Sequence, residues 1–249
     1  MYLTVRGLVL RVTNYNDHDA LLSILTHAHG KLTVKARGIR RKNSPLVAPC
    51  QLLAYSEFTL FEYRGMYTIN EATTLELFHG LRKDLQLLSL GTYFAQVSDV
   101  LCQEDLPNPE LLSLILNCFH AVTKLGRSEI LVKAVFEMRA VCIAGYTPDL
   151  SGCVSCGADT LLQFNVADGH LVCSRCSRGS DVGLRIPVPS GVLDAMRYIC
   201  ACDSRQLFSF RIGDESITQL SQVTELYLST QLERGFSSLD FYKTLLFEN

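Results

Sequence analysis

The chain has 249 residues, of which 48% are hydrophobic and 19% are charged, and its net charge is −2 at pH 7. This composition permits a sizeable apolar core and excludes a globally disordered chain. The net charge alone predicts no nucleic-acid partner, but residues 1–80 hold nine Lys and Arg against six Asp and Glu, which leaves the remainder acidic. A basic first part joined to an acidic remainder suggests a different partner for each part.

The first six residues lack the charged start and the long apolar run of a secretory signal. The longest uncharged apolar stretches, such as residues 85–98, are too short to span a bilayer. We therefore expect a cytoplasmic protein with no membrane partner, in a reducing compartment where most of its ten cysteines stay free. Six of the cysteines lie in apolar or helical contexts and are expected to be small buried residues: Cys50, Cys102, Cys118, Cys142, Cys200 and Cys202.

Residues 1–78 are expected to form strands. Five stretches rich in Val, Ile, Leu, Thr, Phe and Tyr are separated by turn signals, and they cover residues 2–12, 20–26, 32–37, 51–63 and 67–75. No helical period lies between them. Five strands in so short a segment predict a small closed barrel of the OB-fold type, with an SH3-like barrel or a sandwich as alternatives.

The most basic part of the chain is residues 31–42, which we call the basic segment. It has no acidic residue and contains Lys31, Lys35, Arg37, Arg40, Arg41 and Lys42. Because such a segment can follow a phosphate backbone, we predict that these six residues bind DNA; the alternative is a solvated loop that only confers solubility. Nearby aromatic residues could stack on bases if they were exposed, but their alternation with apolar neighbours favours the core: Tyr15, Tyr55, Phe58, Phe61 and Tyr63.

From residue 77 onward the apolar period becomes helical. We predict helices over residues 81–102, from 109 to about 122, and from 129 to about 145, with Asn108 and Ser128 as N-caps. Later helices are predicted from the cap Ser190 to about residue 202, from about 214 to 234, and over 239–247.

Four cysteines interrupt this helical part. Cys153 and Cys156 form one Cys-x-x-Cys pair, and Cys173 and Cys176 form a second. A tight turn can point both thiols of a pair at one spot, and Gly157 suits such a turn. Two pairs supply the four thiolates of a tetrahedral Zn²⁺ site, with residues 161–166 and 170–173 as the hairpin that joins them. The alternative is a set of free or redox-active thiols.

The predicted architecture is therefore α+β and multidomain. Residues 1–78 would form a five-stranded OB-fold barrel, and residues 79–249 a helical domain with an inserted four-cysteine zinc ribbon at about 150–182. One structural zinc ion is the expected cofactor. A ribbon of this size cannot hold a core of its own, so the metal must supply much of its folding free energy.

The residues indicate a protein that is not an enzyme. A four-cysteine site leaves no open position for a reactive water, and a zinc deaminase would need proline where Gly152 stands. No HExxH, GxSxG or phosphate-loop pattern is present. We therefore expect no catalytic residue and no small-molecule substrate.

The run Phe136-Glu137-Met138-Arg139 and the run from Gly145-Tyr146-Thr147-Pro148 to Cys156-Gly157 resemble the RecO family of DNA recombination and repair mediators. In the basic segment, Ala36-Arg37-Gly38-Ile39-Arg40-Arg41-Lys42 is similar to the barrel of the same family. The order of parts also matches, with a barrel, helices, a zinc ribbon and further helices.

The resemblance implies an OB-fold domain that binds single- and double-stranded DNA, strand annealing, and help in loading recombinase onto single-stranded DNA coated by its binding protein. It also implies two protein partners, RecR and the C-terminal tail of single-stranded DNA-binding protein, and a nucleoid-associated place in a bacterial cytoplasm. The tail would dock on the helical domain, for which Arg139 and Arg197 are candidates.

The residues leave a second function open, a zinc-ribbon adaptor between proteins that does not anneal DNA. The charge of the ribbon argues against it as the main nucleic-acid site, because its basic and acidic residues balance. These residues are Arg175, Arg178 and Arg185 against Asp159, Asp168 and Asp181.

Overall fold

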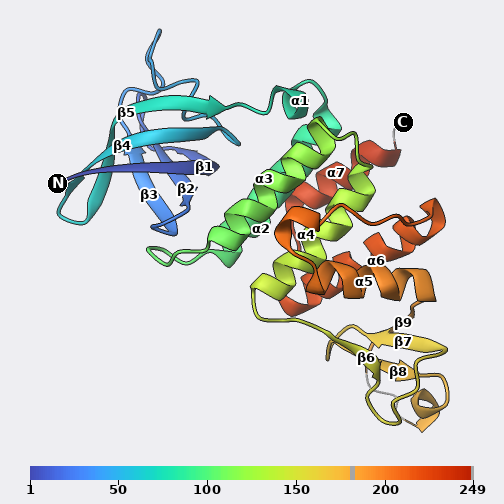
Figure 1. Ribbon diagram of the computed structural model, residues 1–249. Coiled ribbons are helices and arrows are strands. Elements are labelled where there is room, and N and C mark those ends of the chain that lie inside the picture. The colour runs from blue at the N-terminus through green and yellow to red at the C-terminus, as the bar shows by residue number, and fades with distance from the viewer. Residues whose placement is uncertain (180–182, 248–249) are drawn as a thin grey trace. The chain divides into compact units, whose positions relative to one another are not determined.

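The computed structural model describes residues 1–179 and 183–247 (Figure 1). Contacts within the chain group it into two compact units, the first made of residues 1–124 and 236–249 and the second of residues 125–235. Compact units are not the same as independently folding domains, so the predicted division after residue 78 stays a prediction. None of the helices in the described residues combines the length and the apolar character that crossing a membrane requires.

The first unit begins with a closed five-stranded barrel of the OB-fold type, as the turn signals predict. The strands are β1 (Tyr2–Asn14), β2 (Ala20–Thr26), β3 (Lys31–Ala36), β4 (Tyr55–Tyr63) and β5 (Met66–Glu76). Their order around the barrel is β1-β2-β3-β5-β4. All neighbours are antiparallel except β3 and β5, whose short parallel pairing closes the barrel.

The predicted strand over 51–63 starts too early. β4 begins at Tyr55 because the preceding residues form a turn, in which the Ala54 amide donates to the Gln51 carbonyl at 3.0 Å and Leu53 has φ 62°. A left-handed residue cannot continue a strand.

The inside of the barrel is a continuous apolar core. Side chains that alternate along each strand supply it, since successive residues of a strand point to opposite faces. Gly7 in β1 is required by this packing, because a Cβ there would lie 2.5 Å from the Ile24 Cγ2 atom. The core consists of Val5, Val9, Ala20, Leu22, Ile24, Leu32, Val34, Ala36, Ile39, Leu46, Cys50, Phe58, Leu60 and Ile69.

As far as residue 247, the first unit also has four helices: α1 (His79–Arg82), α2 (Leu85–Leu101), α3 (Pro109–Thr123) and α7 (Ser237–Phe247). The prediction of one helix over 81–102 is wrong, because Asp84 starts a new helix there. Its carboxylate accepts hydrogen bonds from the Gln86 and Leu87 amides, which is the N-cap arrangement. The predicted cap Asn108 is confirmed, with its side chain accepting from the Leu111 amide at 3.1 Å.

The last helix returns to pack against α2, although some 140 residues separate them in sequence (Figure 1). Ser238 at the start of α7 donates to the Gln96 side chain, and Ser89 donates to the Ser238 carbonyl at 3.3 Å. The rings of Tyr93 and Phe236 meet edge to face with centroids 5.6 Å apart. α7 is therefore part of the first unit.

The described residues of the second unit form three helices, α4 (Glu129–Ile143), α5 (Ser190–Ala201) and α6 (Asp214–Gln231). Between α4 and α5 lies a small sheet of β6 (Asp149–Cys153), β7 (Leu162–Asn165), β8 (His170–Cys173) and β9 (Arg185–Pro187), in the order β6-β8-β7-β9. β7 and β8 are antiparallel, so the predicted hairpin is confirmed. Short 3₁₀ turns cover Cys176–Gly179 and Ser204–Gln206.

Two predicted caps in this unit do not bond as expected. Pro189 is the N-cap of α5, and Ser190 is the first helical residue. Ser128 does occupy the N-cap of α4, but its side chain makes no capping hydrogen bond.

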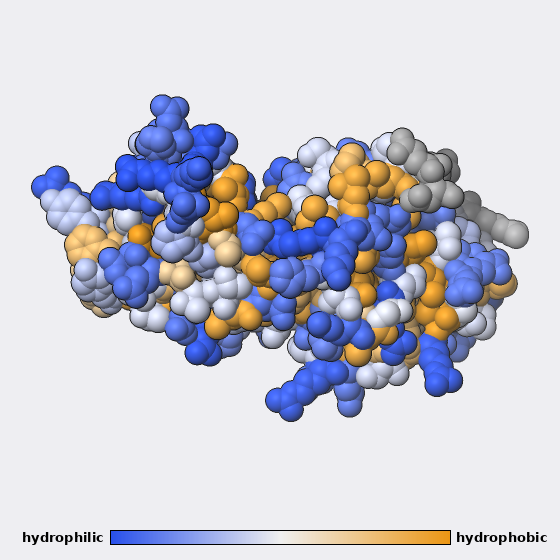
Figure 2. Space-filling model, turned by 90° about the horizontal axis from the view of Figure 1, so that it is seen from above, coloured by the Kyte–Doolittle hydropathy of each residue, from blue (hydrophilic) through white to orange (hydrophobic). Residues whose placement is uncertain are grey.

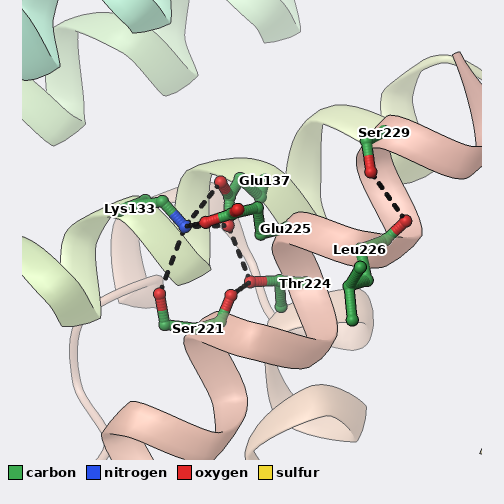
Figure 3. Close-up of polar contacts among 7 residues, drawn as sticks. All are labelled: Lys133, Glu137, Ser221, Thr224, Glu225, Leu226 and Ser229. Carbon is green, nitrogen blue, oxygen red and sulfur yellow. Dashed lines mark hydrogen bonds and ion pairs between the residues drawn. The ribbon is translucent and has the colours of Figure 1, made fainter. Parts of the chain in front are cut away.

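A buried polar cluster joins α4 and α6 (Figure 3). The Lys133 ammonium lies 2.9 Å from the Glu137 carboxylate and 2.8 Å from that of Glu225. Glu137 is fully buried, and Thr224 donates to its carboxylate at 2.8 Å. Because a lone buried charge is costly, these partners are needed to keep charged groups inside the unit.

Candidate metal centre and nucleic-acid interface

The four predicted cysteines meet in space. Their sulfur atoms all lie within 4.8 Å of one another, and they form the one group of three or more metal-ligating side chains within residues 1–179 and 183–247. Four sulfurs at about 2.3 Å from a tetrahedral ion stand about 3.8 Å apart. The Cys156 and Cys173 sulfurs are 3.7 Å apart, which matches this spacing, and the other sulfur pairs lie within 4.8 Å.

Tight turns build each half of this cluster. In the first, the Gly157 amide donates to the Cys153 carbonyl at 2.7 Å, and Gly157 has φ 71°, the left-handed conformation that favours glycine. In the second, the Cys176 amide donates to the Cys173 sulfur at 3.5 Å. The sequence therefore places both thiols of each pair at one point, as predicted.

Backbone amides favour the thiolate form of two of the four cysteines, whereas hydrogen bonds with Cys156 and Cys173 raise the pKa of Cys176 to about 12. A hydrogen bond from the Cys173 backbone lowers the pKa of the Cys153 thiol to about 6, and one from the Cys176 backbone lowers the pKa of Cys173. Thiolates are the form that binds metal. Four thiol ligands fit Zn²⁺ and leave no position for a reacting water, which is the donor set of a structural site.

The basic segment divides into two groups. Lys31 is 15% exposed, and its ammonium lies 2.8 Å from the Asp99 carbonyl oxygen and 3.5 Å from the Asp99 carboxylate. Lys35 is 18% exposed and lies 3.2 Å from the Asp19 carboxylate and over the ring of Tyr15. The structure thus gives both lysines partners inside the first unit.

The remaining four basic residues are exposed on a turn after β3, which we call the arginine loop: Arg37, Arg40, Arg41 and Lys42. Several contacts hold this loop, among them two hydrogen bonds from Arg40, whose amide donates to the His18 carbonyl at 3.0 Å and whose Nη1 donates to the Asn16 carbonyl at 2.9 Å. Ile39 is buried in the barrel core, and the Gly38 amide donates to the Asp19 carboxylate at 2.9 Å. That bond is the main reason that the pKa of Asp19 is lowered to about 2.

Beside the arginine loop lies a hollow of about 550 Å³ on the outside of the barrel, which we call the aromatic hollow. Arg37 belongs to both features. Tyr2, Tyr63 and Met66 are 64%, 60% and 61% exposed there. The hollow is lined by Tyr2, Arg37, Phe61, Tyr63, Arg64, Met66, Thr68, Ile69 and Asn70.

The rings of the hollow are arranged as a surface. Tyr2 and Phe61 are paired across β1 and β4, with ring centroids 5.3 Å apart, and the Arg64 guanidinium lies 5.2 Å from the centre of the Tyr63 ring. Over the barrel, at the left of Figure 2, the surface is mostly hydrophilic with hydrophobic residues exposed among the charged ones. Proteins that bind single strands combine exposed rings, on which the bases stack, with cationic side chains, which contact the phosphates.

The placement of the aromatic residues differs from the sequence prediction. Phe58 is in the core as expected, but Tyr15, Phe61 and Tyr63 are exposed. The strand pattern contains the signal, because Ser56, Phe58 and Leu60 point inward and so odd-numbered residues at the end of β4 point outward. Tyr2 and Met66 were missed because they lie outside the basic segment and its neighbours in sequence.

Other predicted residues have structural partners. Arg139 donates to the carbonyls of Ile199 and Cys200 at 3.1 and 2.9 Å, and Arg197 donates to that of Leu150 at 2.8 Å. In the ribbon, Asp181 lies outside the described residues.

Comparison with known proteins gives consistent matches over almost the whole chain. Family models described as Recombination protein O N terminal and Recombination protein O C terminal match residues 1–78 and 82–240. The chain is 33% identical over 246 residues to the DNA repair protein RecO of Acetivibrio thermocellus, covering 98% of this chain and 97% of the relative. It is 29% identical to that of Alkaliphilus metalliredigens, with 98% and 100% covered, and 28% identical to that of Bacillus subtilis, with 100% and 99% covered.

Proposed function

The chain belongs to the RecO family of DNA repair proteins, and on that basis we propose that it binds single- and double-stranded DNA through its barrel and anneals complementary strands. It then helps to load recombinase onto single-stranded DNA that is coated by its binding protein. The protein acts by binding and positioning strands, without catalytic residues.

The observation that carries this proposal is the aromatic hollow beside the arginine loop, joined through Arg37. The cationic side chains of the loop neutralise phosphates and release counterions, which gives affinity without regard to sequence. The rings of Tyr2, Phe61 and Tyr63 offer stacking faces to unpaired bases. A strand held in this way by its backbone and a few bases leaves its other bases free to find a complement.

Within the basic segment, the proposal gives the six residues different tasks. Arg37, Arg40, Arg41 and Lys42 contact phosphates directly. Lys31 and Lys35 also raise the local positive potential, although Asp99 and Asp19 partly neutralise them.

The proposed partners follow from the family. They are RecR and the acidic, apolar C-terminal tail of single-stranded DNA-binding protein, and the tail would dock on the helical part of the chain. One structural zinc ion would occupy the four-cysteine cluster and stabilise the ribbon.

The salt dependence of DNA binding tests the arginine loop. Each phosphate contact to a single strand contributes about −0.7 to the slope of log K against log salt concentration. Replacing Arg37, Arg40 and Arg41 by Ala should therefore reduce the magnitude of the slope by about 2. The matched control is replacement of the exposed arginines Arg205 and Arg211 of the second unit, which should leave it unchanged. An equal slope for the loop variant and the wild type would contradict the assignment.

The hollow is tested by comparing strand types. Phe61→Ala with Tyr63→Ala should weaken single-strand binding by roughly 10-fold or more, since each stacked base is worth about 1–3 kcal/mol, and should affect duplex binding far less. Equal losses for both would show that the rings support the barrel rather than stack on bases.

An annealing assay separates the proposal from the adaptor alternative. Complementary strands coated with single-stranded DNA-binding protein should anneal faster with the wild type than with the loop variant. Binding to the coating protein alone, with no annealing and no contact to DNA, would favour an adaptor.

A further inference from the structure

Two thiols outside the metal cluster lie in contact in the second unit. Cys142 in the last turn of α4 and Cys200 in the last turn of α5 are 58 positions apart in sequence, yet their sulfur atoms are 3.6 Å apart. Both side chains are partly exposed, whereas the sequence predicted small buried residues. Solvent can therefore reach this pair of thiols, in contrast to the buried thiols of Cys50, Cys102 and Cys118.

Hydrogen bonds from an arginine side chain of α4 to backbone carbonyls of α5 hold the two helix ends together at this point. Arg139, one turn before Cys142, donates from Nη1 to the carbonyls of Ile199 and Cys200 at 3.1 and 2.9 Å. This places a guanidinium next to both thiols. The sulfur–sulfur distance is therefore fixed by two packed helices and does not depend on a loop.

The electrostatic surroundings make one of these thiols reactive. The hydrogen bond with Cys200, the hydroxyl of Thr147 and the charge of Arg139 together lower the pKa of Cys142 to about 7, against the opposing effect of burial. A large fraction of Cys142 is then thiolate at neutral pH, and the thiolate is the nucleophile in thiol oxidation. The same contact raises the pKa of Cys200.

We propose that Cys142 and Cys200 form a modification site at which hydrogen peroxide produces an intramolecular disulfide between α4 and α5. The Cys142 thiolate attacks one peroxide oxygen, the O–O bond breaks, and a sulfenic acid and water result once the leaving hydroxide takes a proton. The Cys200 sulfur then attacks the sulfenic sulfur, and the S–O bond breaks as the second water leaves. Two thiols lose two electrons, and one peroxide becomes two waters.

The geometry makes this bond accessible with small movements. The sulfurs must approach from 3.6 Å to about 2.05 Å. The closed loop would contain the whole ribbon and all four metal ligands, because residues 143–199 lie between the two cysteines. The disulfide would therefore link the helix before the ribbon to the helix after it. Peroxide can also oxidise the thiolates of the metal cluster.

Peptide mapping tests the proposal on the full-length, metal-loaded, reduced protein. After exposure to one to five equivalents of hydrogen peroxide and alkylation of free thiols, non-reducing digestion should yield a linked peptide containing Cys142 and Cys200. Cys142→Ser and Cys200→Ser should each abolish it. The matched control is Cys202→Ser, two residues beyond and also partly exposed, which should retain it.

Metal content, measured in the same samples, shows whether the disulfide forms before or after metal release. A linked peptide formed while the metal is still bound supports the proposal. Linkage that appears only after metal release overturns it, because the thiols then meet only after unfolding. A link from Cys142 to Cys202 or to a ribbon cysteine also overturns it, because Cys200 is then not the partner of Cys142. As a second measurement, Cys142 should react with iodoacetamide at least 10-fold faster than Cys118; equal rates would also overturn the proposal.

Discussion

The barrel and the ribbon are both small β-structures, but they differ in what their strands enclose. The barrel encloses fourteen core side chains from all five strands and from the segment that follows β3. The ribbon has strands of only three to five residues and brings four thiols to its centre. The comparison shows an apolar core in the larger β-structure, and four thiols that could hold a metal ion in the one with the shorter strands.

Loss of the metal should have the largest effect and should be confined to the second unit. Cys156→Ser removes one of four ligands, and structural zinc sites contribute about 10–16 kcal/mol to the folding of small metal domains. We expect metal release and fast amide exchange in β6 to β9, with unchanged exchange in β1 to β5. Ser155→Ala, at the exposed neighbouring position, is the control. Unchanged exchange in the ribbon after metal release would show that its side chains suffice.

The reverse experiment removes part of the barrel core. Phe58→Ala deletes a fully buried ring and should lower the free energy of unfolding of the barrel by about 3–5 kcal/mol. The metal should remain bound, because the ribbon belongs to the other unit. Phe61→Ala, on the outer face of the same strand, should cost much less. Denaturant unfolding with simultaneous metal analysis measures both quantities.

The smallest effect concerns acid. The folded-state pKa of Asp19, lowered from 3.8 to about 2, lies below its value in the unfolded chain. Its contribution to stability is therefore complete above about pH 4 and is lost as the pH falls toward 2. Asp19→Asn should flatten this part of the stability curve of the barrel, measured by amide exchange in β2 and β3.

The acid experiment also bears on the arginine loop, since Asp19 holds Gly38 and Lys35. Asp17→Asn, at an exposed position in the same turn, is the control and should keep the wild-type curve. Equal pH dependence in the wild type and Asp19→Asn would mean that the hydrogen bond to Gly38 adds no net stability.

Local signals in the sequence predicted much of this fold. Turn residues and alternating apolar residues gave the barrel strands, and the spacing of Cys153, Cys156, Cys173 and Cys176 gave the metal cluster, because both depend on residues near one another in the chain. Helix caps were predicted less well. Asp84 is the N-cap of α2, but the helical spacing of apolar residues continues across it and so predicted one unbroken helix.

The rest depended on residues distant in sequence. Tyr2 and Phe61 become neighbours only through the register of β1 and β4. The partners of Lys31 come from Asp99, 68 positions away. The contact of Cys142 with Cys200 needs two helices to cross at their ends. The periodicity of a sequence does not predict contacts between such distant residues. Only the structure therefore shows the aromatic hollow and the difference between the paired lysines and the exposed arginine loop.

The return of α7 to α2 gives the chain an order of assembly during its synthesis. The ribosome makes the barrel, α2 and α3 first, and then about 110 residues of the second unit before it reaches α7. At about 5–20 residues per second, the face of α2 that carries Tyr93 waits on the order of 6–20 s for Phe236 and α7 to cover it. The second unit can fold in that interval. The first unit, whose synthesis begins earlier, is therefore completed after the second.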